Sequence, residues 1–188
     1  MQALVVVDAQ NEFSPEGLRP VPNHGAAVAT ILRLAEIARR EGRPIAWVRH
    51  HNLPHEPKGF MPGSWGAEFS PGLGPQPGRA DEVELVKEVF GAFTGTTLGE
   101  WLDARGSRDV LIVGFFAHMC VSTTAREALM RGLDVSIDPD GTGACAWSHP
   151  LLGAQTAEEV HRTALLQLSH LGVRIVPSAV AAHDGAAR

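Results

Sequence analysis

The 188-residue sequence lacks any apolar run long enough to cross a membrane, and its first residues lack the basic-then-apolar pattern of a signal peptide. It also lacks an excess of basic residues, because 16 Lys and Arg stand against 21 Asp and Glu, for a formal net charge of −5. Such a chain has no electrostatic footprint for nucleic acid or for an anionic membrane. We therefore expect a cytoplasmic protein that has neither nucleic acid nor a membrane as a partner.

Cysteine is scarce, with only Cys120 and Cys145 in the chain. In the reducing compartment that we expect, both remain free thiols rather than forming a disulfide. The length and the composition, 44% hydrophobic and 20% charged, are typical of one globular domain spanning residues 1–188.

One pattern recurs four times: a helical stretch, a glycine, and a short run of β-branched and apolar residues. The glycines stand where the end of a helix needs a left-handed residue, and they are Gly42, Gly106, Gly132 and Gly172. Thr97 with Glu100, and Thr156 with Glu159, have the spacing of capping boxes at two helix starts. The pattern predicts helices that alternate with strands.

The expected strands are mostly continuous apolar runs rather than alternating ones. They read ALVVVDA, PIAWVRH, VELVKEV, DVLIVGF, DVSID and RIVPS. Continuous runs are typical of parallel strands that are buried on both faces. The sequence therefore predicts an α/β fold, a three-layer α/β/α sandwich around a six-stranded, mainly parallel sheet.

Residues 52–78 interrupt this alternation with six prolines and six glycines among 27 residues. A loop of this length inside a compact domain is usually functional or disordered. Because Phe60, Trp65 and Phe69 would be costly to leave in water, we expect an ordered loop that covers part of the molecule.

Three reactive residues lie at the ends of expected strands. Asp8 follows LVVV, Lys87 stands near the end of VELVKEV, and Cys120 comes after DVLIVGF at the start of a helix. Ligands of open parallel sheets bind at the carboxyl ends of the strands, where the strand order reverses. Singly, the three have ordinary structural explanations: a capping carboxylate, an edge lysine and a small buried side chain. Together they indicate one site.

The three residues supply the parts of a nucleophilic site. A lysine ammonium and a helix N-terminus would stabilise the thiolate of Cys120. The carboxylate of Asp8 would take the thiol proton and return it to a leaving group. Backbone N–H groups at the helix start would face an oxyanion. This combination suits acyl transfer at a carbonyl carbon.

The sequence resembles the isochorismatase-like cysteine hydrolases, which include nicotinamidases and N-carbamoylsarcosine amidohydrolases. The resemblance covers nearly the whole chain, in the motifs LVVVDAQNEF, GSWGAEFSPGL, VKEVFGAFTGTTLGEWL, VLIVGFFAHMCVSTTAREALMRGLDV and HRTAL. It implies a cofactor-free hydrolase of a small amide or ureido compound that assembles as a homo-oligomer, a dimer or a tetramer. It assigns catalytic roles to Asp8 as general base, Lys87 as orienting cation and Cys120 as nucleophile.

The resemblance also implies a cis peptide bond between Phe115 and Phe116, with the backbone N–H groups of Phe116 and Cys120 forming an oxyanion hole. The chain departs from the family pattern at three places near the pocket. Ala117 replaces a usual threonine, Gly91 replaces a usual serine, and DPDGTGACAWSHP replaces a compact turn. These departures leave the identity of the substrate open.

The candidate substrate-binding residues are Phe13, Trp65, Phe93 and His118. By the resemblance, aromatic residues at the positions of Phe13 and Phe93 flank a small planar substrate. The same two residues could also belong to the hydrophobic core.

The stretch RHHNLPHEP contains His50, His51 and His55, whose spacing is compatible with a zinc site. Nicotinamidases of the family bind their metal through an Asp-x-His pair and a later histidine, whereas Val48 and Arg49 stand two residues before His50 and His51 here. We therefore expect no metal, and a role for these histidines at a loop start or a substrate-contacting edge. GFFAHMC also lacks the glycine spacing of a nucleotide-binding loop.

Two other functions remain open. An isochorismatase-type hydrolase of a vinyl ether would use Asp8 as an acid catalyst and would retain activity without Cys120. A thiol redox or binding protein would oxidise Cys120 to a sulfenic acid and resolve it with Cys145. A redox thiol has no need of a carboxylate base, whereas both kinds of hydrolase use Asp8. A role for Asp8 therefore distinguishes a hydrolase from a thiol redox protein.

Overall fold

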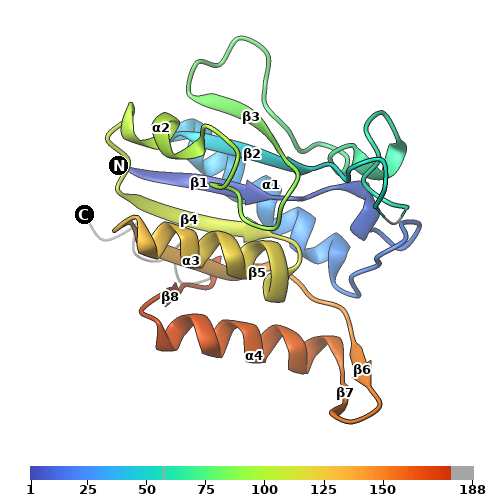
Figure 1. Ribbon diagram of the computed structural model, residues 1–188. Helices are drawn as coiled ribbons and strands as arrows, with labels where there is room; N and C mark the ends of the chain where they lie inside the picture. Colours follow the sequence, from blue (N-terminus) through green and yellow to red (C-terminus); the bar gives the residue numbers. More distant parts are fainter. Residues whose placement is uncertain (57, 179–188) are drawn as a thin grey trace.

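The computed structural model describes residues 1–56 and 58–178 (Figure 1). Its main sheet has six parallel strands in the order β3-β2-β1-β4-β5-β8. They are β1 (Gln2–Val7), β2 (Ile45–His50), β3 (Glu82–Lys87), β4 (Asp109–Gly114), β5 (Asp134–Thr142) and β8 (Arg174–Ile175). The predicted six-stranded parallel sheet is confirmed.

Helices cover both faces of this sheet, which confirms the three layers (Figure 1). One face packs against α1 (His24–Arg40), and the other packs against α2 (Leu98–Asp103), α3 (Ser122–Met130) and α4 (Ala157–His170). Successive residues of β1 point to opposite faces, so that Val6 shares a core with α1 while Val5 and Val7 share the other core with α2 and α3. None of the described helices has an apolar stretch long enough to cross a membrane.

The helix ends follow the sequence pattern with one exception. The four glycines at the helix ends all have positive φ: Gly42, Gly106, Gly132 and Gly172. The capping box at α4 forms, since Thr156 accepts the N–H of Glu159 at 3.2 Å and Glu159 accepts the N–H of Thr156 at 2.8 Å. The box at α2 does not form: Thr97 makes no capping hydrogen bond with its side chain, and the hydroxyl of Thr96 accepts the N–H of Leu98 at 3.2 Å instead.

A small antiparallel hairpin, β6 (Trp147–His149) and β7 (Gly153–Gln155), joins β5 to α4 and is not predicted by the sequence pattern. It projects past the first turns of α4 in Figure 1, and all its strand residues are exposed. Strands of three exposed residues have no buried face, so they leave no hydrophobic periodicity to detect.

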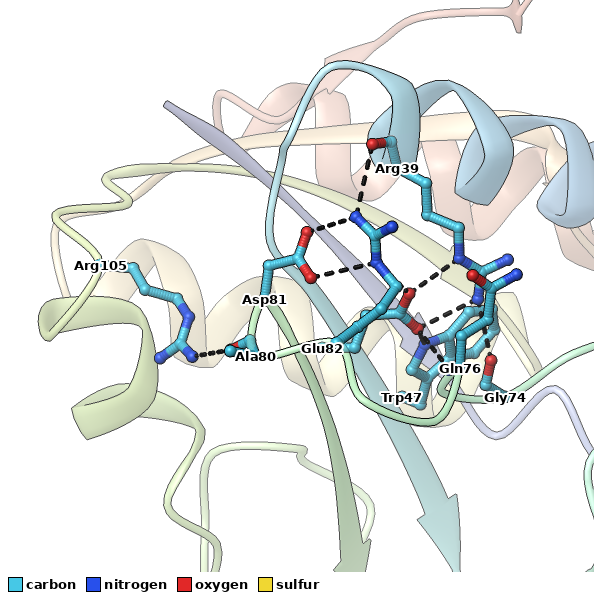
Figure 2. Close-up of polar contacts among 9 residues, drawn as sticks. Arg39, Trp47, Gly74, Gln76, Ala80, Asp81, Glu82 and Arg105 are labelled. Carbon is cyan, nitrogen blue, oxygen red and sulfur yellow. Dashed lines mark hydrogen bonds and ion pairs between the residues drawn. The ribbon is translucent and has the colours of Figure 1, made fainter.

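A buried carboxylate at the start of β3 anchors the long loop between β2 and β3 (Figure 2). The inaccessible side chain of Glu82 accepts hydrogen bonds from Arg39 Nε and Nη2 at 2.8 and 3.1 Å and from Trp47 Nε1 at 2.8 Å. The backbone N–H of Gln76, in the loop, donates to the same carboxylate at 3.2 Å. Burial alone would raise the pKa of Glu82, but the hydrogen bonds from Arg39 and Trp47 outweigh burial and lower it.

The aromatic residues of this loop divide into two that pack and one that does not. Phe60 is buried with its ring centroid 5.2 Å from that of Phe13, and the ring of Phe69 meets that of Trp47 at 5.9 Å. These contacts confirm an ordered loop that covers part of the molecule. Trp65, however, is 54% exposed, so the argument from the cost of exposure is wrong for this residue.

The strand order reverses between β1 and β4, which are neighbours in the sheet although they are far apart in the sequence. Gly114 ends β4 with a φ of 119°, and a Cβ atom there would lie 1.8 Å from the carbonyl oxygen of Val7. Only glycine permits this close approach. It brings the segments that follow β1 and β4 to the same edge of the sheet.

Candidate active site

Asp8 leaves β1 at the point where the strand order reverses. Its φ of 51° is left-handed, its N–H donates to the carbonyl oxygen of Val48 at 2.8 Å, and its own carbonyl oxygen accepts the N–H of Gln10 at 2.8 Å. These bonds fix the turn by which the chain leaves the sheet. The carboxylate is fully buried at the carboxyl edge.

Lys87 is the last residue of β3 and is paired in register with His50 of β2. Because β2 separates β3 from β1, the side chain of Lys87 has to extend across β2 to reach Asp8. Its Nζ lies 2.7 Å from Oδ2 of Asp8, and it donates to the carbonyl oxygen of Val89 at 3.1 Å. Burial opposes the charge of Lys87, but the Asp8 carboxylate and the Cys120 sulfur outweigh burial and raise the pKa, so the ammonium is retained.

Cys120 lies in a single π-helical turn, Ala117–Val121, that precedes α3. The thiol is in hydrogen-bonding contact with both Asp8 and Lys87. Burial, followed by the negative charge of Asp8, raises the pKa of Cys120 above its ordinary value, and the opposing effect of Lys87 is smaller. Lys87 thus lowers the thiol pKa, as expected of a neighbouring cation, but burial and the charge of Asp8 outweigh it and the net direction is upward.

The peptide bond between Phe115 and Phe116 is cis, as the resemblance implies. The Phe116 ring is 7% exposed and meets the ring of Phe13 edge-on at 4.7 Å. An oxyanion hole formed by the backbone N–H groups of Phe116 and Cys120 stays a prediction.

A cavity of about 450 Å³ opens onto these residues, with Asp8, Cys120, Phe13 and Phe116 in its wall. Sequence reasoning misses most of the rest of the wall. Its apolar part comes from Phe60, Val89, Phe90 and Met119, and its polar part from Arg19, His50, Asn52, Glu56 and Glu88. His50, considered from the sequence for a loop start or a substrate-contacting edge, ends β2 at the carboxyl edge and lines this wall.

The structure does not bring the other three candidate substrate-binding residues to this cavity. Trp65 lines a separate hollow of about 660 Å³ on the loop side. Phe93 is buried in the core, with the guanidinium of Arg131 5.0 Å from its ring centroid. His118 lines a third hollow of about 420 Å³, where its Nε2 accepts a hydrogen bond from Trp147 Nε1 at 2.9 Å.

The departure from the family pattern at Gly91 explains part of the placement of Phe93. A Cβ atom on Gly91 would lie 2.2 Å from the carboxylate of Glu127. That carboxylate accepts the backbone N–H of Phe93 at 3.0 Å. Glycine thus makes room for a glutamate that holds this segment against α3.

The histidines after β2 do not form a metal centre. Within residues 1–56 and 58–178, no three His, Cys, Asp or Glu side chains are grouped so that they could hold a metal ion. The ring of His50 is engaged on both sides, by Lys87 Nζ at 3.2 Å and by Asn52 Oδ1 at 2.8 Å, while His55 is exposed. These residues do not fit a metal site, and no step of the chemistry below depends on one.

Comparisons with known proteins identify the family and the fold. The family model described as an isochorismatase domain matches residues 2–180. The secreted isochorismatase effector Isc1 of Verticillium dahliae is 37% identical over 140 residues, which are 74% of this chain and 71% of the effector.

Two solved structures extend the likeness to the whole fold. An isochorismatase from Pseudomonas putida KT2440 superposes with a TM-score of 0.86 at 31% identity, covering 95% of this chain and 88% of that one. The N-carbamoylsarcosine amidase of Thermoplasma acidophilum superposes with a TM-score of 0.76 at 27% identity, covering 94% and 96%.

Proposed function

The chain belongs to the isochorismatase family of hydrolases, and from this premise we propose that it is a cysteine-dependent hydrolase of a small amide or ureido C–N bond. The observation that supports the proposal is the buried group of Asp8, Lys87 and Cys120, of which Asp8 and Cys120 line one cavity and Lys87 lies behind them, paired with Asp8. A relative named as an amidase shares the fold over nearly its whole length.

The first half of the reaction transfers the acyl group to sulfur. The thiol proton of Cys120 passes to the carboxylate of Asp8 as Sγ attacks the carbonyl carbon, so that a C–S bond forms while the carbonyl electrons move to oxygen. When the C=O bond forms again, the C–N bond breaks and Asp8 gives the proton to the departing amine or ammonia. A thioester on Cys120 remains.

The second half releases the acid. Asp8 accepts a proton from a water molecule as the water oxygen attacks the thioester carbon. The C–S bond then breaks, the sulfur leaves with its electron pair, and Asp8 returns the proton to it. The site is thereby restored to a protonated thiol and an ionised carboxylate.

Lys87 stays protonated throughout and offsets the negative charge that moves between Asp8 and Cys120. The backbone N–H groups of Phe116 and Cys120 would stabilise the oxyanion. Each role is filled by a group of the chain, so the proposal needs no cofactor. A cytoplasmic location would keep Cys120 reduced, and it forms part of the proposal.

Ammonia or amine release from a panel of small amides and ureido compounds tests this function. Cys120→Ala and Cys120→Ser should lose turnover, because neither an alkyl group nor a poorly acidic hydroxyl can replace the thiol. Cys145→Ser is the matched control and should keep full activity, since Cys145 does not line the cavity. Mass spectrometry of acid-quenched reactions should show an acyl adduct on Cys120.

The same variants separate amide hydrolysis from the acid-catalysed cleavage of a vinyl ether. Such cleavage would persist in Cys120→Ala and disappear in Asp8→Ala, because only the carboxyl group would supply a proton. Turnover that survives in Cys120→Ala would therefore overturn the cysteine mechanism.

A further inference from the structure

The ammonium of Lys87 has four partners close by, one of which is the Cys120 sulfur. The other three partners are Oδ2 of Asp8, with which Nζ forms an ion pair at 2.7 Å, the carbonyl oxygen of Val89 at 3.1 Å and Nδ1 of His50 at 3.2 Å. The side chain is fully buried, so water does not compete for these contacts. Removing the His50 acceptor would release one N–H of the ammonium, so that the cation can shift toward its remaining partners.

These contacts fix the protonation state of His50. An ammonium can only donate, so Nδ1 of His50 must be unprotonated and accept. The ring proton then sits on Nε2, which lies 2.8 Å from Oδ1 of Asn52. The imidazole is therefore neutral and has a single tautomer.

The charges around His50 come from three neighbouring elements: Lys87 on β3, Asp8 after β1, and Glu56 in the loop. Burial, followed by the charge of Lys87, lowers the pKa of His50, although the two carboxylates oppose this shift. The lowered pKa of His50 agrees with the neutral ring that the hydrogen-bonding geometry requires.

His50 is itself held in place. Its backbone N–H donates to Oε1 of Gln10 at 2.8 Å, and Nε2 of Gln10 donates back to the carbonyl oxygen of His50 at 3.0 Å. The ring of Phe60 meets the imidazole edge-on, with the centroids 5.3 Å apart. An imidazole fixed at its backbone and its ring presents Nδ1 at a constant position.

We propose that His50 is a positioning residue, whose neutral imidazole accepts a hydrogen bond from Lys87 and thereby holds the ammonium between Asp8 and Cys120. This inference rests on the proposed function, because it explains how the cation stays in place while protons move between the carboxylate and the sulfur. His50 acts through Lys87, and Asn52 sets the tautomer that makes this possible.

Long-range ¹H–¹⁵N spectra of the ¹⁵N-labelled protein at pH 7.5 test the tautomer directly, with the His50 signals assigned by their loss in His50→Asn. The expected result is a neutral ring with a proton on Nε2 and an unprotonated Nδ1. A proton on Nδ1, in either the neutral or the charged ring, overturns the proposal, since Lys87 could not then donate to it.

The rate of Cys120 alkylation by iodoacetamide at pH 7.5 tests the positioning, in a Cys145→Ser background. In His50→Asn the side-chain oxygen stands near the place of Nδ1 and preserves an acceptor, so the rate should stay within about three-fold of the unsubstituted protein. His50→Leu offers similar bulk without an acceptor and should lower the rate by about ten-fold or more, because a displaced cation no longer lowers the thiol pKa.

Equal rates of Cys120 alkylation in His50→Asn and His50→Leu overturn the proposal, whether both are normal or both are reduced. If His50 acted by packing alone, a variant with an acceptor and a variant without one would react alike. Should His50→Leu fail to fold, the tautomer of the unsubstituted protein decides the question. Neither measurement uses a substrate, so a failure to find amide turnover and a failure of the positioning role are separate results.

Discussion

Nζ of Lys87 lies 2.7 Å from Oδ2 of Asp8, and the exposed fractions of the two side chains are 0% and 1%. The attraction between two such charges is largely offset by the cost of removing both from water. The effect of the pair on the free energy of unfolding is therefore largest when one partner is removed and the other remains charged and buried. Since β2 separates the strands that carry them, the pair also links β1 to β3.

Asp8→Asn should destabilise the fold by about 3–5 kcal/mol, because it leaves the ammonium of Lys87 buried without its counter-ion. Lys87→Met should have a similar effect on the buried carboxylate. The double variant should be more stable than the sum of the single losses implies, while all three lack hydrolytic activity. Urea unfolding of the four proteins measures this cycle, and strictly additive losses would show that the two charges are not coupled.

Two of the catalytic candidates, Asp8 and Lys87, could be found from the sequence because their positions depend on the strands alone. A residue at the end of a parallel strand reaches the carboxyl edge whatever the loops do, and Asp8 and Lys87 are placed in this way. The same reasoning applies to the glycines that end helices, whose conformation is a local requirement.

Apart from His50 at the end of β2, most residues that line the rest of the cavity could not be found, because their direction depends on the path of loops. Trp65 and Phe60 lie five residues apart in one proline- and glycine-rich loop, yet Phe60 faces the cavity and Trp65 does not. Phe93 is drawn into the core by a backbone hydrogen bond to Glu127, which no pattern in its own segment indicates. The raised thiol pKa of Cys120 likewise depends on burial, which the sequence shows only indirectly.

Gly114→Ala should destabilise the protein by more than about 3 kcal/mol, because its Cβ would clash with the Val7 carbonyl oxygen and its φ is unfavourable for alanine. Gly25→Ala is the matched control. This exposed glycine in α1 has no neighbour within 4 Å of an added Cβ, so alanine there should stabilise the helix by roughly 0.5 kcal/mol. Thermal and urea unfolding distinguish the two, and similar effects at both positions would contradict the close approach of β4 to β1.

Glu82→Gln should cost about 2–4 kcal/mol of stability at pH 7, since the amide cannot accept both hydrogen bonds of Arg39 and leaves that cation without its partner. The pKa of Glu82 is lowered in the folded state, so its contribution is complete above the ordinary value of 4.5 and is lost as the pH falls through the folded pKa. The difference between the two proteins should therefore shrink on acidification.

Urea unfolding at pH 7 and below pH 4 measures this dependence. Asp103→Asn provides the control, because its ion pair with Arg108 is exposed and should contribute less than about 1 kcal/mol at either pH. An undiminished difference between Glu82→Gln and the unsubstituted protein at low pH would show that hydrogen-bonding geometry, rather than charge, accounts for the cost.

Arg19 brings a guanidinium into the wall of the cavity that contains Cys120. It lies 5.1 Å from the ring centroid of Phe60, and its contact with the carboxylate of Glu12 is long, at 3.4 Å. Glu56 and Glu88 line the same wall, so the preference of the cavity for a negative or a positive ligand depends on whether Arg19 is present.

Alkylation of Cys120 by iodoacetate and by iodoacetamide reports this preference, because the reagents are similar in size and differ in charge. Arg19→Gln should lower the ratio of the iodoacetate rate to the iodoacetamide rate by about three- to ten-fold at low salt, and less at high salt. Any change in the thiol pKa cancels in the ratio, since both reagents attack the same thiolate. Arg49→Gln is the control: Arg49 also lies 5.1 Å from a phenylalanine ring, that of Phe69, but outside this wall.

The outcome bears on the choice of substrates. A ratio that falls only in Arg19→Gln would direct the search toward amides that carry a carboxylate, because the guanidinium would then act on an anion bound near Cys120. A ratio unchanged by either substitution would show that Glu12 neutralises Arg19, and Glu56 and Glu88 would then set the charge of the cavity. In that case amides with a cationic group become the better candidates, since the carboxylates of Glu56 and Glu88 would attract them.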